Sequence, residues 1–395
     1  MLASEPASAR ITRRITFVPT DAWCANSATK IYELCRAGRV TYAFTDTFYN
    51  PAGNFMPVWR PAVCVGYLDN AFVMPGYPIL MSPDGHVPTE RFLNKVGFAQ
   101  SLQQFTTDSV EQALAAAFTG GDGSIDLALP ADVFSIDEEA ILLGGNPNFG
   151  HFLNEYMLRL PLFEMFAELR DKPILLYDYV PQRYADFMEL AGIAKSRIRR
   201  IPSSRPLSCK RLWFASEPVY WRQDGAPAFW PEPMHMLRAR IMANLPKMSW
   251  GKRERIYLPR GQAVHRRLLN EEEVFKIFAQ QGFRSVNLAD HSAVEQMKLI
   301  VNCEALAGPL SAGLSISMLA PSDCAVLQFE GMRKIYLYNS TLAGMALGQT
   351  LGTIVGEISA PSQGESRGPA YDDFSIRLDV AETTLKATLA CLTSS

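Results

Sequence analysis

The segment NPNFGHFLNEYMLRLPLF (146–163) places three ionisable side chains at helical spacing. His151, Glu155 and Arg159 fall at positions i, i+4 and i+8, so a helix would carry them on one stripe beside an apolar flank. His151 stands in the first turn, where the helix dipole favours a neutral imidazole. A neutral histidine or a carboxylate in a cleft can take a proton from an attacking hydroxyl. The alternative is a solvated Glu155–Arg159 salt bridge, and spacing alone favours that alternative.

Small residues in GPLSAGLS (308–315) form a second candidate site. A predicted strand ends there and a short helix begins. Gly308, Ser311, Ala312 and Gly313 would let backbone N–H groups approach an anion at that helix start. The segment matches neither the GxGxxG nor the GxSxG pattern. A plain strand–helix turn explains the same residues.

A basic cluster forms the third candidate. Arg260, His265, Arg266 and Arg267 follow the predicted strand RIYLP (255–259). Arginines at the carboxyl end of a parallel strand suit a diphosphate, which they can grip with two hydrogen bonds each. An ordinary surface charge run is the alternative, and the sequence does not decide between the two.

Strands alternate with helices from residue 255 onward. This alternation predicts a parallel, doubly wound sheet, which binds ligands beyond the carboxyl ends of its strands. Asn270 with Glu273, and Ser292 with Glu295, have the spacing of capping boxes. The predicted strands are 255–260, 285–288, 305–308 and 325–329, and the predicted helices are 270–282 and 292–302.

The N-terminal part combines a β meander with further α/β elements. Turn signals such as Pro-Gly and Pro-Asp-Gly separate short apolar runs within residues 62–87. A proline-rich segment at 216–251 indicates a crossing between two domains. The remaining predicted elements are helices at 108–119, 148–170, 181–191 and 234–245 and strands at 173–177 and 211–215.

Composition narrows the class of protein. The chain has 395 residues and a formal net charge of -2, which gives no support for nucleic-acid binding. We find no secretory signal and no apolar stretch of about 18 residues, so we expect a cytoplasmic protein. Its seven cysteines show no CxxC spacing, and HExxH and P-loop motifs are absent. We therefore expect free thiols and no bound metal.

Three tracts resemble, in this order, the family 61 glycosyltransferases, which include bacterial capsular polysaccharide biosynthesis proteins. The first is the apolar helix led by H-x-L-x-E and closing in R-L-P (151–161). The second is IYLPRGQAVHRRLLNEEEVFKIFAQQGF (256–283), whose R…RR…NE pattern is the most specific. The third is EQMKLIVNCEALAGPLSAGLSISMLAP (295–321), and the likeness extends from about residue 60 to about residue 360.

The resemblance implies a GT-B-like α/β architecture, in which two Rossmann-type, doubly wound domains face a cleft. The N-terminal domain would add the meander and hold the acceptor, and the C-terminal domain would hold a nucleotide-sugar. The implied divisions are an acceptor-side domain at 1–215 with its meander at about 55–90, a crossing at 216–250, a donor domain at 251–360, and a C-terminal tail at 361–395 whose helix packs back.

The resemblance also implies an activity. The enzyme would be an inverting, metal-independent glycosyltransferase that moves a sugar to a saccharide or lipid-linked saccharide in bacterial surface polysaccharide synthesis. Arginines and a helix N-terminus would stabilise the leaving diphosphate. Peripheral association with the inner face of the plasma membrane stays open, and the sequence does not define the oligomeric state.

The matching positions assign roles residue by residue. Glu155 would be the catalytic base, and His151 would orient the acceptor or a phosphate. A capping box would make Asn270 and Glu271 largely structural. The implied donor-binding residues are Arg260, Arg267, Asn270, Gln296, Gly308, Ser311, Ala312, Gly313, Gln328 and Glu330.

The third tract departs from the family pattern G-x-H-G-A-G-L-T-N. Leu310 and Ser311 stand for its His-Gly pair, and Ile316 stands for its Asn. Gln328 replaces a family glutamate, although Glu330 lies close by. These departures favour an alternative, a catalytically silent member that binds a sugar or a protein partner through the same cleft. An unrelated dehydrogenase is a third alternative, but the chain lacks its glycine fingerprint.

Overall fold

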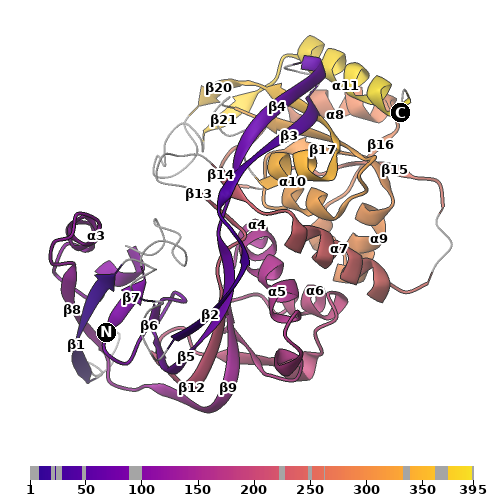
Figure 1. Cartoon of the computed structure of the whole chain (residues 1–395). Coiled ribbons are helices and arrows are strands. Elements are labelled where there is room, and N and C mark those ends of the chain that lie inside the picture. The colour runs from indigo at the N-terminus through magenta and orange to yellow at the C-terminus, as the bar shows by residue number, and fades with distance from the viewer. Residues whose placement is uncertain are drawn as a thin grey trace, which may run out of the picture.

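The chain is a mixed α/β fold in which two sheet-based lobes lie one above the other (Figure 1). The computed structural model describes residues 9–18, 23, 29–46, 50–88, 100–221, 227–247, 251–261, 263–331, 339–360 and 372–393. A nine-stranded sheet with helices α8 to α11 forms the C-terminal lobe. A seven-stranded and a three-stranded sheet with helices α3 to α6 form the N-terminal lobe.

The centre of the C-terminal lobe is the parallel sheet that the alternating pattern predicts. Its strands lie in the order β16-β15-β17-β18-β19, and each neighbouring pair is parallel. The strands are β15 (Glu254–Tyr257), β16 (Phe283–Ser285), β17 (Cys303–Pro309), β18 (Ala325–Glu330) and β19 (Thr350–Val355). The helices are α8 (Glu271–Gln280), α9 (Ala293–Val301), α10 (Asn339–Leu347) and α11 (Leu378–Thr393). The predicted strand at 285–288 is wrong, because β16 ends at Ser285 and a 3-10 turn follows at Leu288–Asp290.

The two predicted capping boxes have different outcomes. Ser292 and Glu295 form one at the start of α9, as expected. Asn270 precedes α8, but its side chain makes no capping hydrogen bond. Its Nδ2 instead donates to the carbonyl of Ile376 at 2.7 Å, and its Oδ1 accepts from the amide of Ile376 at 3.1 Å. Asn270 therefore holds the C-terminal segment, which is a contact that helix periodicity cannot reveal.

The seven-stranded sheet of the N-terminal lobe is mixed. Strands β9 to β12 pair in parallel, and β5 and β2 join them antiparallel in the order β11-β10-β9-β12-β5-β2, with β6 beside β5. Its strands are β2 (Thr29–Cys35), β5 (Val63–Val73), β6 (Leu80–Met81), β9 (Phe134–Gly144), β10 (Ile174–Tyr177), β11 (Ile198–Ile201) and β12 (Leu207–Ala215). The three-stranded sheet consists of β1 (Arg10–Val18), β7 (His86–Pro88) and β8 (Ser124–Pro130).

Three of the four predicted helices of this part are present. They are α3 (Val110–Phe118), α6 (Tyr184–Leu190) and α7 (Glu232–Asn244). Helix α3 begins at Ser109, whose side chain accepts from the amide of Gln112, and Gly120 follows its end with φ +79. Only glycine adopts that backbone conformation without strain, so the helix stops where the Gly-Gly signal predicts.

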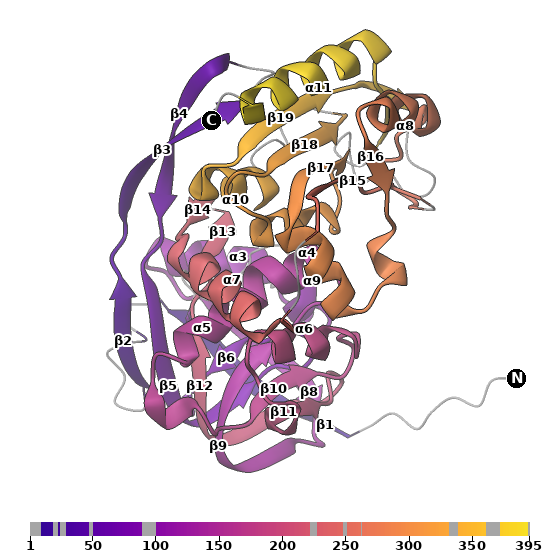
Figure 2. The ribbon, with the colours of Figure 1, turned by 90° about the vertical axis from the view of Figure 1, so that its right-hand side faces the viewer.

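A hairpin from the N-terminal part of the sequence joins the C-terminal sheet. Strands β3 (Gly38–Asp46) and β4 (Asn50–Arg60) pair with each other, and β3 pairs in parallel with β19. The hairpin continues strands β2 and β5, so one long ribbon runs along both lobes (Figures 1 and 2). Two short strands of the proline-rich crossing, β13 (Val219–Trp221) and β14 (Pro227–Phe229), extend the same sheet. Residues 38–46 and 50–60, which precede residue 215, therefore belong to the sheet of the C-terminal lobe.

The helix predicted at 148–170 is broken into short pieces. A single α turn (Phe149–His151) is followed by a π turn (Phe152–Tyr156), a 3-10 turn (Met157–Arg159) and α5 (Leu160–Phe163). Pro161 has no N–H to donate to the preceding turn, which explains why regular α-helix cannot continue through it. We refer to residues 149–163 as the central helical segment.

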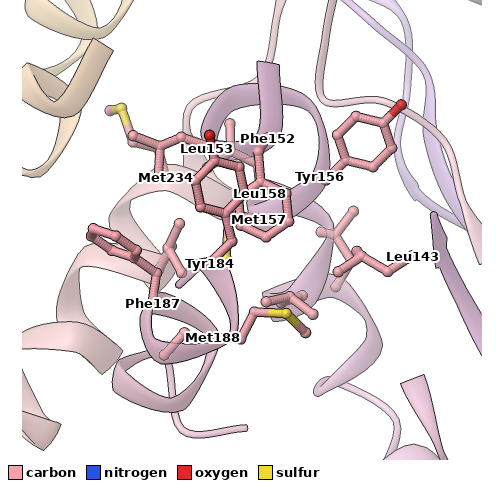
Figure 3. Close-up of a cluster of buried hydrophobic side chains, with 14 of the residues drawn as sticks. Leu143, Phe152, Leu153, Tyr156, Met157, Leu158, Tyr184, Phe187, Met188 and Met234 are labelled. Atoms are coloured by element: carbon pink, nitrogen blue, oxygen red, sulfur yellow. The ribbon is translucent and has the colours of Figure 1, made fainter. Parts of the chain in front are cut away.

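Packing holds the central helical segment in place. Its apolar side chains meet those of α6 and Met234 of α7 in one buried cluster (Figure 3). The rings of Phe152 and Tyr184 lie 4.7 Å apart between centroids. Phe152, Leu153, Met157 and Leu158 are fully or almost fully buried. The first turn of the segment is thus fixed by the core behind it.

Two further expectations can be compared with the described residues. Cys35, Cys209, Cys303 and Cys324 carry free thiols, as the dispersed cysteines predict, whereas Cys24 lies outside the described residues. No helix in the described part of the chain is long and apolar enough to cross a membrane.

Candidate active site between the lobes

A cavity of about 370 Å³ lies where the two lobes meet. We refer to it as the cleft. The start of the central helical segment, α6 and the loops of the C-terminal lobe come together there, beside α9 (Figure 2). Its N-terminal-lobe wall consists of Pro147, Asn148, Phe149, Arg183, Tyr184 and Phe187. Its C-terminal-lobe wall consists of Leu258, Pro259, Arg260, Val286, Asn287, Leu288, Ala289, Gln296, Ser311, Ala312 and Gly313.

The lobes touch closely at one edge of the cleft. A Cβ on Gly150 would lie 3.0 Å from Ser315 Oγ and 3.2 Å from the Cα of Ala312. Asn148 caps the helix start that carries this glycine, since its Oδ1 accepts from the amides of Gly150 and His151. Glycine at position 150 therefore allows the two lobes to come this close, and a larger residue there would push them apart.

Five of the predicted donor-binding residues line the cleft. They come from the loop after β15, from α9 and from the loop after β17, which are separate in sequence but adjacent at the carboxyl edge of the sheet. They are Arg260, Gln296, Ser311, Ala312 and Gly313. Arg183 also lines the cleft from the N-terminal lobe, and nothing in the sequence marks this position beyond its charge.

The loop after β15 holds Arg260 in a defined position. Its backbone N–H donates to Glu271 Oε1 at 2.9 Å, and its Nη2 donates to the carbonyl of His265 at 2.7 Å. Burial and the nearby charge of Arg266 lower the pKa of Arg260 to about 10. The guanidinium is therefore still charged at neutral pH and only partly compensated. A partly buried cation of this kind favours an anionic ligand.

Gln296 also has a fixed orientation. Its Nε2 donates to the carbonyl of His291 at 2.9 Å, and the residue is 7% exposed. The capping box of Ser292 and Glu295 fixes the helix start just before it. Gln296 thus lines the cleft from the capped first turn of α9.

Two predicted donor-binding residues contact the C-terminal segment instead. Arg267 binds Asp373 through its backbone N–H at 2.8 Å and through Nη2 at 2.6 Å. Asn270 binds the backbone of Ile376. Neither lines the cleft. These contacts hold the segment with Asp373 and Ile376, which lies just before α11. They give Arg267 and Asn270 of the R…NE pattern a structural role.

Gly308, Gln328 and Glu330 do not line the cleft either. Gln328 and Glu330 lie in β18 and are 4% and 1% exposed. A Cβ on Gly308 would lie 2.4 Å from the carbonyl oxygen of Leu258. The glycine is needed for the close packing of β17 against β15, which positions Leu258 and the cleft wall after it.

We expect Gly308→Ala to destabilise the protein. The added methyl group overlaps a backbone oxygen that cannot rotate away, and overpacking of this kind costs about 1–3 kcal/mol. Gly313→Ala is the matched control, because its Cβ would meet only Ser311 Oγ at 3.6 Å. Urea denaturation should show the loss in the first variant and less than about 0.5 kcal/mol in the second. Equal stability of the two variants would contradict the packing role.

His151 and Glu155 form a hydrogen-bonded pair. The distance from His151 Nδ1 to Glu155 Oε1 is 2.5 Å. The side chain of His151 is 45% exposed, whereas that of Glu155 is 11% exposed. The hydrogen bond to Glu155 raises the pKa of His151, which is the opposite direction from the one expected of the helix dipole. A direct carboxylate partner outweighs the dipole of a helix that is one turn long.

The pair is within electrostatic reach of the C-terminal lobe. The charge of Arg266, in the loop after β15, lies close enough to lower the pKa of His151. The same charge acts on Arg260. His151 is three residues from Asn148, which lines the cleft. The exposed imidazole and the arginines of the opposite lobe therefore belong to one electrostatic neighbourhood.

Arg159 has a different partner from the one that spacing suggests. Its Nη2 donates to Glu217 Oε1 at 2.7 Å, and the side chains of Arg159 and Glu217 are 9% and 6% exposed. The solvated Glu155–Arg159 salt bridge is therefore wrong. Glu217 follows β12 at the start of the proline-rich crossing, and it belongs to none of the three candidate sites that the sequence indicates. A charged residue two positions after the apolar strand RLWFA was the available signal.

No three His, Cys, Asp or Glu side chains gather as a possible metal site within the described ranges.

Comparison with known proteins matches one part of the chain to a family. Residues 149–327 match the model of the family Glycosyltransferase 61. The matched region begins at the central helical segment and ends in β18, so it includes most of the residues that line the cleft. This part of the chain is therefore similar to Glycosyltransferase 61 domains. A search of curated proteins finds no match.

Solved structures of low similarity were also found. One is the bacterial iron-containing dodecameric glycosyltransferase TibC from enterotoxigenic E. coli H10407, at 9% identity and a TM-score of 0.32, covering 99% of each chain. Another is the dodecameric iron-containing heptosyltransferase TibC in complex with ADP-D-beta-D-heptose, at 10% identity and a TM-score of 0.35, covering 98% of this chain and 100% of that chain.

Proposed function

We propose that this protein is an inverting, metal-independent glycosyltransferase that moves a sugar from a nucleotide-sugar to a saccharide acceptor. The observation that carries the proposal is the cleft, most of whose lining residues lie inside the family-matched region. It sets Arg260 and the loop Ser311–Gly313 opposite the start of the central helical segment. The two lobes would then act as a GT-B-like pair, with the donor on the C-terminal lobe and the acceptor on the N-terminal lobe.

The donor would bind through its diphosphate. Arg260 is charged, partly buried and held by Glu271, so it can stabilise the negative charge that grows as the diphosphate leaves. Backbone N–H groups at Ser311–Gly313 can approach the same oxygens. Arg183 offers a second cation from the opposite wall. Electrostatic stabilisation by these groups takes the place of a metal ion in this proposal.

The burial of the His151–Glu155 pair reverses the roles that the resemblance favoured. Glu155 is almost covered, whereas His151 is half exposed and reachable by an acceptor. Glu155 would accept the Nδ1–H bond and leave Nε2 free to take the proton of the acceptor hydroxyl. The hydroxyl oxygen then forms a bond to the anomeric carbon from the face opposite the diphosphate. The bond to the diphosphate oxygen breaks, and its electron pair leaves with the nucleotide.

The biological setting follows from the family resemblance. The acceptor would be a saccharide or lipid-linked saccharide in bacterial surface polysaccharide synthesis. The reaction would take place in the cytoplasm, where nucleotide-sugars are available, and at the inner face of the membrane for a lipid-linked acceptor. Nucleic acid is not a partner in this proposal.

A specific observation keeps the silent-member alternative in view. Leu310 and Ile316 stand where the family pattern has polar residues, and they are 5% and 0% exposed. Both side chains pack in the core and offer nothing to a ligand. In the silent alternative, the cleft would bind a sugar or a protein partner without transfer.

Calorimetric titration with nucleoside diphosphates tests the proposal. We expect one diphosphate to bind and its affinity to be unchanged by EDTA. A Kd that rises in EDTA would contradict metal independence. A folded protein that binds no nucleoside diphosphate or nucleotide-sugar would contradict the donor site and favour the silent alternative.

A further inference from the structure

Glu155 lies between two possible partners, His151 four residues before it and Arg159 four residues after it. Spacing alone allows either pair. In the structure, Glu155 binds His151 at 2.5 Å, and Arg159 binds Glu217 at 2.7 Å. Glu155 and Arg159 therefore each bind a partner other than one another.

Arg159 keeps the capacity to bind a second carboxylate. Its Nε is buried and has no hydrogen-bond partner among the described residues. Its guanidinium carbon lies 4.9 Å from the ring centroid of Tyr156, the residue after Glu155. The pKa of Tyr156 is affected by three nearby charges, those of Glu155, Arg159 and Glu217. All three charged groups therefore lie near the ring of Tyr156. A guanidinium released by Glu217 would thus have Glu155 as its nearest alternative on the same helical segment.

We propose that Glu217 is a positioning residue that keeps Glu155 on His151 by holding Arg159. The proposal rests on the proposed function, because it concerns the group that would act as base. Glu217 touches no substrate in this account. It acts through Arg159, which would otherwise compete with His151 for the Glu155 carboxylate.

The surroundings of Glu217 couple this arrangement to pH. The charged and titratable groups facing the network are Arg159, Glu155 and His151 of the central helical segment, Tyr77 of the turn after β5, and Arg266 near His151. Burial raises the pKa of Glu217 above its usual range, with Arg159 opposing. As the pH falls, Glu217 is therefore protonated at a higher pH than an ordinary carboxylate. Glu217→Gln imitates that state at any pH.

Histidine NMR gives a test that requires no donor or acceptor. The chain has five histidines, and the signals of His151 can be assigned with His151→Gln. The wild type should show a strongly downfield proton on Nδ1, bound to Glu155. In Glu217→Gln, we expect that resonance to disappear and the pKa of His151 to fall, because Glu155 turns to Arg159. In the double variant Glu217→Gln with Arg159→Met, we expect the downfield resonance to reappear and the pKa of His151 to return to its wild-type value.

Three results would overturn the proposal. They are an unchanged downfield proton in Glu217→Gln, an unchanged pKa of His151 there, and no recovery in the double variant. The double variant leaves no unpaired buried charge and so guards against unfolding. If Glu217→Gln does not fold, Glu217→Asp replaces it. Its shorter side chain should lose the bond to Arg159 and weaken the downfield signal, and an unweakened signal would overturn the proposal.

Kinetics separates this role from a merely structural one. We expect Glu217→Gln to lower kcat by about 10- to 100-fold through misplacement of the base, with the donor KM unchanged. The acid limb of its pH profile should move with the pKa of His151. A loss of activity without that movement would contradict the positioning role. If the wild type shows no transfer at all, the proposed function fails, and the NMR result still decides the role of Glu217.

Discussion

Replacing His151 with alanine should lower kcat by about 10²- to 10⁴-fold, the range that a positioned general base contributes. The exposed imidazole is the group that can reach an acceptor hydroxyl, and Glu155 holds its other nitrogen. Nucleotide affinity should stay the same, because His151 does not line the cleft that would hold the donor. Steady-state kinetics and calorimetry on the same preparation measure the two effects.

His235→Ala is the matched control for this prediction. His235 lies exposed on α7 and does not line the cleft. The control should retain wild-type kcat and wild-type nucleotide affinity. If both variants retain the wild-type kcat, His151 is not the base. If both lose kcat to the same large extent, the loss is a general effect of removing a histidine and does not identify His151 as the base.

The pH dependence of wild-type activity also tests whether His151 is the base. His151 acts as a base only when its ring is unprotonated, so activity falls as the pH drops through its pKa. Glu155 raises that pKa, so the acid limb should lie above the ordinary histidine value of about 6.5. Glu155→Gln should move the acid limb to lower pH. An acid limb that stays in place would separate Glu155 from the titrating group.

Arg260→Ala should weaken the binding of the nucleoside diphosphate by about 10- to 100-fold. A hydrogen bond to a charged group contributes about 1.5–3 kcal/mol, and each 1.4 kcal/mol is tenfold in affinity. Arg260 lines the cleft and remains charged at neutral pH. The loss should be larger in kcat/KM than in the Kd of the nucleotide, because the charge on the leaving diphosphate grows in the transition state.

Arg284→Ala removes the same charge from another place and serves as the control. Arg284 lies in β16, does not line the cleft and pairs with Glu254 at 2.6 Å at the surface. Its replacement should leave nucleotide binding unchanged. Equal weakening in both variants would mean that Arg260 acts only through net charge, and no weakening in Arg260→Ala would place the diphosphate elsewhere.

The sequence predicts the C-terminal lobe well because its elements carry local signals. Hydrophobic periodicity and the capping box of Ser292 and Glu295 place helix α9 almost to the residue. The loops after β15 and β17 also meet at the carboxyl edge of a parallel sheet, as the strand–helix alternation requires. The members of the cleft that come from this lobe were therefore predictable.

Long-range contacts account for the errors. The β3–β4 hairpin joins the C-terminal sheet through backbone pairing that no residue pattern marks. Arg267 pairs with Asp373, more than 100 residues later in the sequence. Glu217 takes Arg159 away from the i,i+4 partner that helical spacing suggests. In each case, a partner distant in sequence outweighs the local pattern.

The most direct test of the central claim is a transfer assay with the nucleotide-sugar that calorimetry selects. Released nucleoside diphosphate and the anomeric configuration of the product are followed together by NMR, in the presence of EDTA and with an oligosaccharide acceptor series. We expect one diphosphate to be released for each new glycosidic bond, with the configuration inverted. Binding of the donor without release of diphosphate, or a product that retains the donor configuration, would contradict this expectation.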